Sequence, residues 1–507
     1  MNLEGKRVLI FQQRGWGKGI GRFLAKKLQE EGCELAAVTF KRTTHDLIVN
    51  QPGVKYKLII SNDDLVSQPQ DYLANNSYSI DDICNDLGIN SIWPIASTVR
   101  NYVRSYKEKF YYSFRQNVSD EVILDYVRAT YKSIKVIEDQ FKPDLIIAPN
   151  FVELFHIMYN LYFAKRGVPM LGVFDIKIKG VYIFSQNFNA DGNQFCDRVD
   201  ELNAERVESE NRKKAQQYIK EFRENFKKPD YMKSLGKHIP FLKKLRQEIS
   251  PFYQVLKWYL KPQVNQINYW ESVGPTLDYK PPRIILRDHY CRKWYTRFSN
   301  NYNYYPFENL GKFVYFPLQV QPEASLDVTA PFFNNQIEMA RLTAMSLPDD
   351  YVLVVKDHPA MLGLRNPSYL KKIDKTPNIK LIDYRISSEK VLKRADLVIS
   401  PNSTTLAEAA FLNKPAIQFG NLATTLKLPN VFKYTDISTL NIAIKEVLSK
   451  NLNTENYERG LENYVAAAYD TGFSVDYIAA WEQGKQELQE PLWQVYKKEF
   501  ERLLKYE

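Results

Sequence analysis

The feature that most constrains this chain is an alternation of short apolar runs with helix-length segments in its C-terminal half. Each run is too short for a buried helix and is bounded by polar residues, which is typical of strands buried on both faces. Five such runs lie at 312–318, 351–356, 379–382, 397–400 and 415–420. Because helix-length segments separate them, the pattern predicts a doubly wound parallel sheet flanked by helices.

The N-terminal half shows the same rhythm. Apolar runs at 6–11 and 34–40 enclose a segment of helical period, and runs at 142–150 and 167–173 enclose another. A chain of 507 residues is too long for one ordinary core. We therefore predict an α/β protein built from two Rossmann-like doubly wound domains.

The expected boundaries follow from these patterns. We assign residues 1–200 to an N-terminal Rossmann-like domain and 306–460 to a C-terminal Rossmann-like domain. Residues 201–305 are highly charged and lack strand patterns, which predicts a basic helical insertion and a linker. Residues 461–507 are amphipathic and aromatic, so we expect C-terminal helices that pack across both domains.

Four glycines follow the first expected strand, at Gly15, Gly17, Gly19 and Gly21. Their spacing is not an in-frame GxGxxG, and no acidic residue ends the second strand, so a dinucleotide site is disfavoured. A glycine-rich loop here would instead let the backbone approach a substrate. Gly15 and Gly17 are therefore candidates for substrate binding.

Polar residues follow the expected C-terminal strands at the points where the strands end. The carboxyl ends of parallel strands share one sheet edge, and a hydroxyl-rich helix N-terminus can hold phosphate. Ordinary helix capping explains Asn402 or Ser403 equally well, and His358 could serve a structural hydrogen bond. The candidate donor-binding residues are Lys356, His358, Pro359, Asn402, Ser403, Thr404, Thr405 and Glu408.

The segment after the first C-terminal strand also opens at this edge. Glu323 there is a candidate general acid, base or nucleophile, with helix capping as the alternative. Gln319 and Gln321 are candidates for binding substrate hydroxyls. In the N-terminal domain, Glu153 is a second candidate for the catalytic carboxylate, and Asn150 a candidate for substrate binding.

These motifs resemble the bacterial capsule polysaccharide biosynthesis family, which includes the Kdo transferases of capsule and lipopolysaccharide assembly. The resemblance implies the GT-B architecture, in which two Rossmann-like domains face a cleft and the donor binds mainly in the C-terminal one. It also implies no metal ion and contacts from His358, Ser403 and Thr404 to the CMP moiety. The matching segments are PLQVQPEAS (317–325), KDHP (356–359), ISS and ADLVISPNSTTLAEA within 386–410, and KPAIQFG (414–420).

We therefore expect a nucleotide-sugar-dependent glycosyltransferase that needs no cofactor. CMP-Kdo or a related acid sugar is the leading donor, and a capsule or lipopolysaccharide glycan, free or lipid-linked, is the expected acceptor. CDP-glycerol glycerophosphotransferases share the Lys-x-His-Pro feature, so polyol-phosphate transfer of the teichoic-acid type stays open. A non-catalytic glycan-binding or export subunit of the same fold is the third alternative.

Location follows from what the sequence lacks. No stretch approaches the ~18 apolar residues of a membrane span, and the first 30 residues hold no secretory apolar core. The four cysteines are scattered, without metal-ligand spacing. We expect a cytoplasmic protein.

One segment carries most of the excess positive charge. Residues 204–262 hold 15 Lys/Arg against 7 Asp/Glu. Such a cluster favours an anionic partner, and we expect peripheral contact with the inner membrane or with a lipid-linked acceptor. A solvated helical face is the alternative, and nucleic acid is disfavoured because no nucleic-acid-binding motif accompanies the charge.

Overall fold

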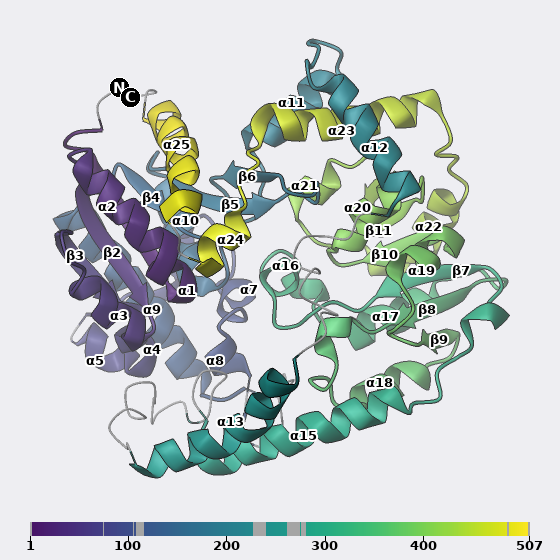
Figure 1. The fold of residues 1–507 in the computed structure, drawn as a ribbon, viewed down its shortest axis with the longest axis horizontal. Helices are drawn as coiled ribbons and strands as arrows, with labels where there is room; N and C mark the ends of the chain where they lie inside the picture. The colour runs from purple at the N-terminus through teal and green to yellow at the C-terminus, as the bar shows by residue number, and fades with distance from the viewer. Residues whose placement is uncertain are drawn as a thin grey trace.

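The computed structural model describes residues 3–74, 76–104, 106–107, 116–226, 240–260, 274, 280–483 and 486–504. It contains two six-stranded sheets, one in each lobe of the molecule (Figure 1). The first has the order β3-β2-β1-β4-β5-β6, with β6 antiparallel to β5 and the other pairs parallel. Its strands are β1 (Arg7–Gln13), β2 (Glu34–Phe40), β3 (Tyr56–Ser61), β4 (Leu145–Ile147), β5 (Met170–Asp175) and β6 (Tyr182–Ser185).

The second sheet has the order β12-β11-β10-β7-β8-β9, and all its pairs are parallel. Its strands are β7 (Phe313–Pro317), β8 (Val352–Lys356), β9 (Ile379–Ile382), β10 (Leu397–Ser400), β11 (Ala416–Gln418) and β12 (Val431–Lys433). Both sheets therefore have the Rossmann strand order, which reverses between β1 and β4 in one and between β7 and β10 in the other. Ligands of such sheets bind beyond the carboxyl ends of the strands at this reversal.

Helices cover both faces of the first sheet. Near-continuous apolar sequence buries α10 on almost all sides, whereas α9 buries one face only. The helices up to residue 203 are α1 (Arg14–Trp16), the π-helix η1 (Gly17–Gly21), α2 (Arg22–Glu30), α3 (Arg42–Val49), α4 (Asn62–Ser67), α5 (Pro69–Leu73), α6 (Ile80–Leu87), α7 (Trp93–Ala96), α8 (Arg100–Val103), α9 (Asp120–Gln140), α10 (Leu154–Ala164) and α11 (Gln194–Asn203).

The second sheet is flanked by shorter helices. Side-chain caps begin several of them: Asn335, Asn366, Ser387 and Ser403 each accept from a backbone N–H of the first turn. These helices are η3 (Phe307–Asn309), α16 (Ala324–Asp327), η4 (Pro331–Phe333), α17 (Gln336–Met345), η5 (Pro359–Met361), α18 (Pro367–Asp374), α19 (Ser388–Arg394), α20 (Thr404–Phe411), α21 (Ala423–Leu426), η6 (Ile437–Thr439) and α22 (Leu440–Leu448).

The segment between the sheets divides into two structurally different parts. Helix α12 (Arg212–Glu224) buries Tyr218 and Phe222 against Phe411 of α20, so it belongs to the core. Helices α13 (Phe241–Leu260) and α15 (Pro282–Asn300) instead run along the lower edge of both lobes (Figure 1). The expected basic arm over 204–262 is therefore not one unit. Its residues 227–239 and 261–262 lie outside the described residues.

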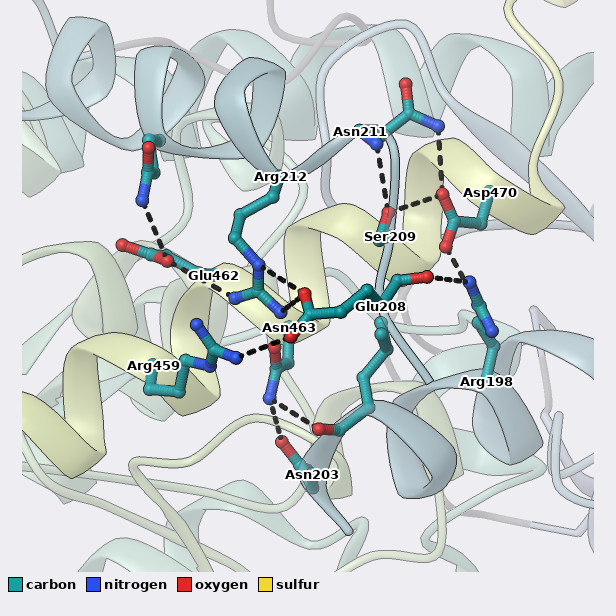
Figure 2. Close-up of polar contacts among 12 residues, drawn as sticks. Arg198, Asn203, Glu208, Ser209, Asn211, Arg212, Arg459, Glu462, Asn463 and Asp470 are labelled. Carbon is teal, nitrogen blue, oxygen red and sulfur yellow. Dashed lines mark hydrogen bonds and ion pairs between the residues drawn. The ribbon is translucent and has the colours of Figure 1, made fainter. Parts of the chain in front are cut away.

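The last helices return to the N-terminal lobe. Helix α23 (Glu455–Thr471) lies against α11 and α12 (Figure 1), and α24 (Tyr477–Gln483) and α25 (Gln486–Leu503) share a core cluster with β1 and α2. Figure 2 shows the polar side of the α23 contact. Asp470 accepts from Arg198, Ser209 and Asn211, while Arg212 contacts Glu208 and Glu462. No helix among the described residues is long and apolar enough to cross a membrane.

Candidate active site

Three neighbouring strands of the second sheet end in the residues that the sequence singled out. Strand β7 leads to Gln319–Glu323, β8 to Lys356–Pro359, and β10 to Asn402–Thr405. Because β7 and β10 flank the strand-order reversal, these loops lie at the position where Rossmann-like sheets bind ligands.

His358 is held as a neutral hydrogen-bond donor. Its Nδ1 accepts from the Ala360 backbone N–H at 3.1 Å, so the neutral ring carries its proton on Nε2. Burial, together with the positive charges of Lys356 and Arg365, lowers the pKa of His358 to about 4. At neutral pH the Nε2–H can therefore donate to an anion.

The β10 loop begins helix α20. The Ser403 Oγ accepts from the Thr405 backbone N–H at 3.1 Å and caps the helix. Asn402 is fully buried, and its amide donates to Ser325 O at 2.9 Å and Thr329 Oγ1 at 2.8 Å. Asn402 therefore ties the β10 loop to the β7 loop through its amide N–H groups, and its donor contact stays a prediction.

The Lys356 side chain is also occupied. Its Nζ donates to the carbonyl oxygen of Ile386 at 3.0 Å and lies 3.4 Å from Ser388 Oγ, in a residue that is almost fully buried. Next to it, Asp357 Oδ1 lies 3.0 Å from Nε of the buried Arg365, whose Nη2 donates to Gln319 O at 2.7 Å. Lys356 thus holds the loop before α19 and supplies charge to the site from within the protein.

The expected hydroxyl binders Gln319 and Gln321 are buried. The Gln321 amide donates to Asp327 Oδ1 at 2.9 Å, and its oxygen accepts from Gln336 Nε2 at 3.0 Å. The Gln319 amide donates to Pro317 O at 2.9 Å, and the Gln336 side chain accepts from its backbone N–H at 2.5 Å. Both glutamines are used in shaping the β7 loop, and their substrate contact stays a prediction.

Glu323 stands at the start of α16 and faces the other lobe. Its side chain is exposed to solvent, and the protein around it reduces the hydration of the carboxyl group enough to raise the pKa of Glu323. The positive charges of Lys177 and Arg100, both from the N-terminal lobe, oppose the rise. A carboxylate whose pKa is raised and on which cations of the opposite lobe act is suited to acid–base chemistry.

A separate crevice lies between residues of the two lobes. Thr404 and Glu408 of α20 line it from one side, and Lys177 and Lys179 from the β5–β6 connection line it from the other. Tyr218 of α12 closes one end, and its hydroxyl accepts from the Lys179 backbone N–H at 3.1 Å. Hydroxyl, ammonium and carboxylate groups together suit a polar anionic ligand.

The glycine segment is helical rather than an open loop. A Cβ on Gly17 would lie 2.8 Å from the backbone carbon of Gln12, and one on Gly21 would lie 2.1 Å from the Gln12 side-chain oxygen. Gly15 is exposed, with its Cβ position 3.0 Å from the Trp481 indole nitrogen. These glycines allow close packing of η1 on β1 and α24. The expected substrate contacts of Gly15 and Gly17 thus have a packing explanation.

The other candidates of the N-terminal lobe follow β4, across the strand-order reversal from the glycines. Asn150 is half-buried. Glu153 precedes α10, and its charge acts on the buried Tyr126 of α9 within the same lobe. Cations of the opposite lobe, Lys177 and Arg100, act on Glu323, which makes Glu323 the candidate that we develop below.

Lys177 and Arg100 are the functional candidates that the sequence patterns did not reveal. Lys177 lies in a turn with φ +69°, and its Nζ lies 3.4 Å from Asp175 Oδ2. Arg100 begins the short helix α8. Neither belongs to a motif, and the one available signal for Lys177 was its position just after β5.

The same residues lie in a segment that matches a known family. Residues 274–424 match the family described as "Capsule polysaccharide biosynthesis protein". The resemblance to that family is confirmed. The matched segment contains all three strand-end loops described above, and no curated protein matches the chain.

Solved structures with similar architecture have low sequence identity to the chain. KpsC of Thermosulfurimonas dismutans, a beta Kdo 2,7 transferase, is 13% identical over 69% of this chain and 84% of its own, with a TM-score of 0.35. MnaA of S. aureus with UDP is 12% identical over 95% and 98%, with a TM-score of 0.26. The UDP-GlcNAc 2-epimerase of Neisseria meningitidis is 10% identical over 92% and 97%, with a TM-score of 0.26. The strand order of both sheets identifies the fold as GT-B.

Proposed function

We propose that this protein is a glycosyltransferase that moves a sugar from a nucleotide donor to a bacterial surface glycan. The observation that carries the proposal is the position of Glu323, between cations of one lobe and the strand-end loops of the other. The match to capsule polysaccharide biosynthesis proteins supports a capsule glycan as the product. CMP-Kdo or a related acid sugar remains the leading donor, and transfer is proposed to need no metal ion.

The donor phosphate would lie between the lobes. His358 donates through Nε2–H, the Thr404 hydroxyl offers a second contact, and Lys177 supplies positive charge. As the bond between the anomeric carbon and the phosphate oxygen breaks, negative charge builds up on the phosphate. Hydrogen-bond donors that are already in place stabilise that negative charge without reorganising, which lowers the activation barrier.

Glu323 would act as the base in direct displacement. Its carboxylate takes the proton from the acceptor hydroxyl while the hydroxyl oxygen forms the new bond to the anomeric carbon. The nucleotide leaves with the electron pair of the broken bond. In a retaining reaction the same carboxylate would attack first and form a glycosyl-enzyme.

Two variants separate binding from chemistry. His358→Asn keeps an acceptor near the Ala360 N–H but loses the Nε2–H, so we expect weaker stabilisation by a cytidine nucleotide in a thermal-shift titration. Glu323→Gln should keep that stabilisation and lose transfer by about 10²- to 10⁴-fold. Glu338→Gln, on the surface of α17, is the control and should change neither measurement.

The titration should compare CMP, CDP, UDP and GDP, and the transfer products should be analysed by mass. A product that gains a polyol phosphate would replace this proposal with the transferase of the teichoic-acid type, which shares the Lys-x-His-Pro feature. If no nucleotide stabilises the protein, a non-catalytic glycan-binding or export subunit becomes the better explanation. Full transfer by both variants would contradict the assigned roles.

A further inference from the structure

Helix α13 leaves most of an apolar face exposed. None of its residues is buried, and Phe241 and Leu242 are each exposed over more than three quarters of their surface. Large exposed apolar side chains are rare as a contiguous group on soluble proteins and mark an interaction surface. On this helix they are Phe241, Leu242, Leu245, Ile249, Phe252, Tyr253, Leu256, Tyr259 and Leu260.

Their spacing places them all on one side. At 100° per residue the nine positions occupy an arc of about 120° along the full length of the helix. The half-buried positions Glu248, Pro251, Val255 and Trp258 lie outside that arc. Glu248 contacts Lys293 of α15 at 2.5 Å, so this second side is the one that packs on the protein. The apolar arc is therefore turned away from α15 except near one border, where the Phe252 ring packs edge-on against His289 of α15, with the ring centroids 5.7 Å apart.

The charge around the arc is positive. Helix α13 carries four Lys/Arg and one Glu, and α15 carries five Lys/Arg and one Asp. Both acidic residues are already paired, Glu248 with Lys293, and Asp288 with Lys280 and Arg287. The charge presented outward by the two helices is thus cationic.

These features decide between three possible environments for α13. Its charges exclude a membrane-spanning role for the helix. Arg246 and Lys257 lie beside the arc. If α13 paired with α13 of a second copy of the chain, these basic side chains would face basic side chains of that copy. The resulting charge repulsion disfavours a coiled coil between two copies. An apolar arc bordered by Lys and Arg, with aromatic residues within it, fits a helix lying in the interface of an anionic bilayer.

We propose that α13 docks this protein on anionic lipid, with its apolar face inserted at the level of the headgroups. Helix α15, which supports it, contacts both lobes: Arg287 donates to Lys107 O of one at 3.1 Å, and Tyr295 OH accepts from Asn366 of the other at 3.0 Å. Figure 1 shows both helices along one edge of the molecule, below the two sheets. Docking through α13 therefore presents this edge to the membrane, where a lipid-linked acceptor would lie.

Vesicle sedimentation with the full-length protein tests the proposal. Wild-type protein should bind vesicles of phosphatidylglycerol mixed with phosphatidylcholine and should bind phosphatidylcholine vesicles much more weakly. The triple variant Leu245→Gln, Ile249→Gln, Leu256→Gln should bind the mixed vesicles at least about tenfold more weakly. Neutralising Lys243, Arg246 and Lys257 with Gln should lower binding by about fivefold per charge, less so at high salt.

The matched control lies on α22, where Ile442→Gln with Lys445→Gln removes an exposed apolar and a basic residue from another surface helix. This variant should bind as the wild type does. Equal binding of wild type to both vesicle types, or an unchanged triple variant, would overturn the proposal. The proposal would also be overturned if the wild type formed a dimer that did not bind vesicles and the triple variant did not form that dimer. None of these measurements requires transfer activity, so failure here leaves the proposed function untouched.

Discussion

At the scale of single residues, the ionisation of Glu323 depends on two opposing influences. Loss of hydration raises the pKa of its carboxyl, and Lys177 and Arg100 lower it. A base must be deprotonated to act, so activity should fall as the pH falls through this raised pKa. If the pH–rate profile has an acid limb, its midpoint should therefore lie at a pH above the ordinary pKa of a glutamate.

Replacing Lys177 with Met removes one of the charges that stabilise the carboxylate. The pKa of Glu323 should rise further, which moves the acid limb of kcat/KM to higher pH by about one unit. Lys179→Met is the matched control, because Lys179 is in the same turn but is not among the charges acting on Glu323. An acid limb in the same place for both variants would show that Glu323 is not the titrating base.

At the scale of elements, the packing of η1 on its neighbours depends on glycine residues that have no side chain. The Gly21 Cβ position lies 2.1 Å from the Gln12 side-chain oxygen and 2.7 Å from the Trp16 ring, both in the core. An alanine has the better helix propensity, but the space for its methyl group does not exist. Sterics therefore outweigh propensity at this position.

Gly21→Ala should lower the free energy of unfolding by about 1–3 kcal/mol, as overpacked cores do. Urea denaturation followed by circular dichroism measures it. Gly311→Ala is the control, because its Cβ position meets nothing within 4 Å. A stabilised Gly21→Ala variant would mean that η1 does not pack this tightly on β1.

At the scale of the whole molecule, the β7 loop joins the lobes. Val328 belongs to the core cluster of the N-terminal lobe, and Asp327 lies 3.4 Å from Arg104 of that lobe, with both side chains buried. The backbone N–H of Ala423 also donates to Asn189 O at 2.9 Å. The loop that carries Glu323 is therefore held by both lobes.

Arg104→Met should destabilise the protein by about 3–5 kcal/mol, because it leaves Asp327 buried with a lost counter-charge. The double variant with Asp327→Asn should recover part of this loss. Urea midpoints measure both, with Lys312→Met as control, since its pair with Asp350 is exposed to solvent and should add little to stability. Equal midpoints for Arg104→Met and Lys312→Met would contradict a buried link between the lobes.

Several strands were predictable because their apolar runs are buried on both faces. The expected runs at 379–382 and 397–400 coincide with β9 and β10, and 351–356 differs from β8 by one residue. The sequence patterns missed β3 and β6, which lie at the two ends of the first sheet, and β12, which lies at one end of the second. Edge strands are paired on one side only and carry polar residues, so their apolar signal is weaker.

The sequence by itself determined the two-sheet architecture and the group of polar residues at one sheet edge, since parallel strands end on the same side. Only the tertiary structure decided which of these side chains are occupied, as Gln321 is by Asp327 and Gln336. It also decided that Lys177 and Arg100 act on Glu323 and that α12 is buried while α13 is exposed. Burial and charge at these positions depend on contacts between distant segments, which local patterns of residues do not specify.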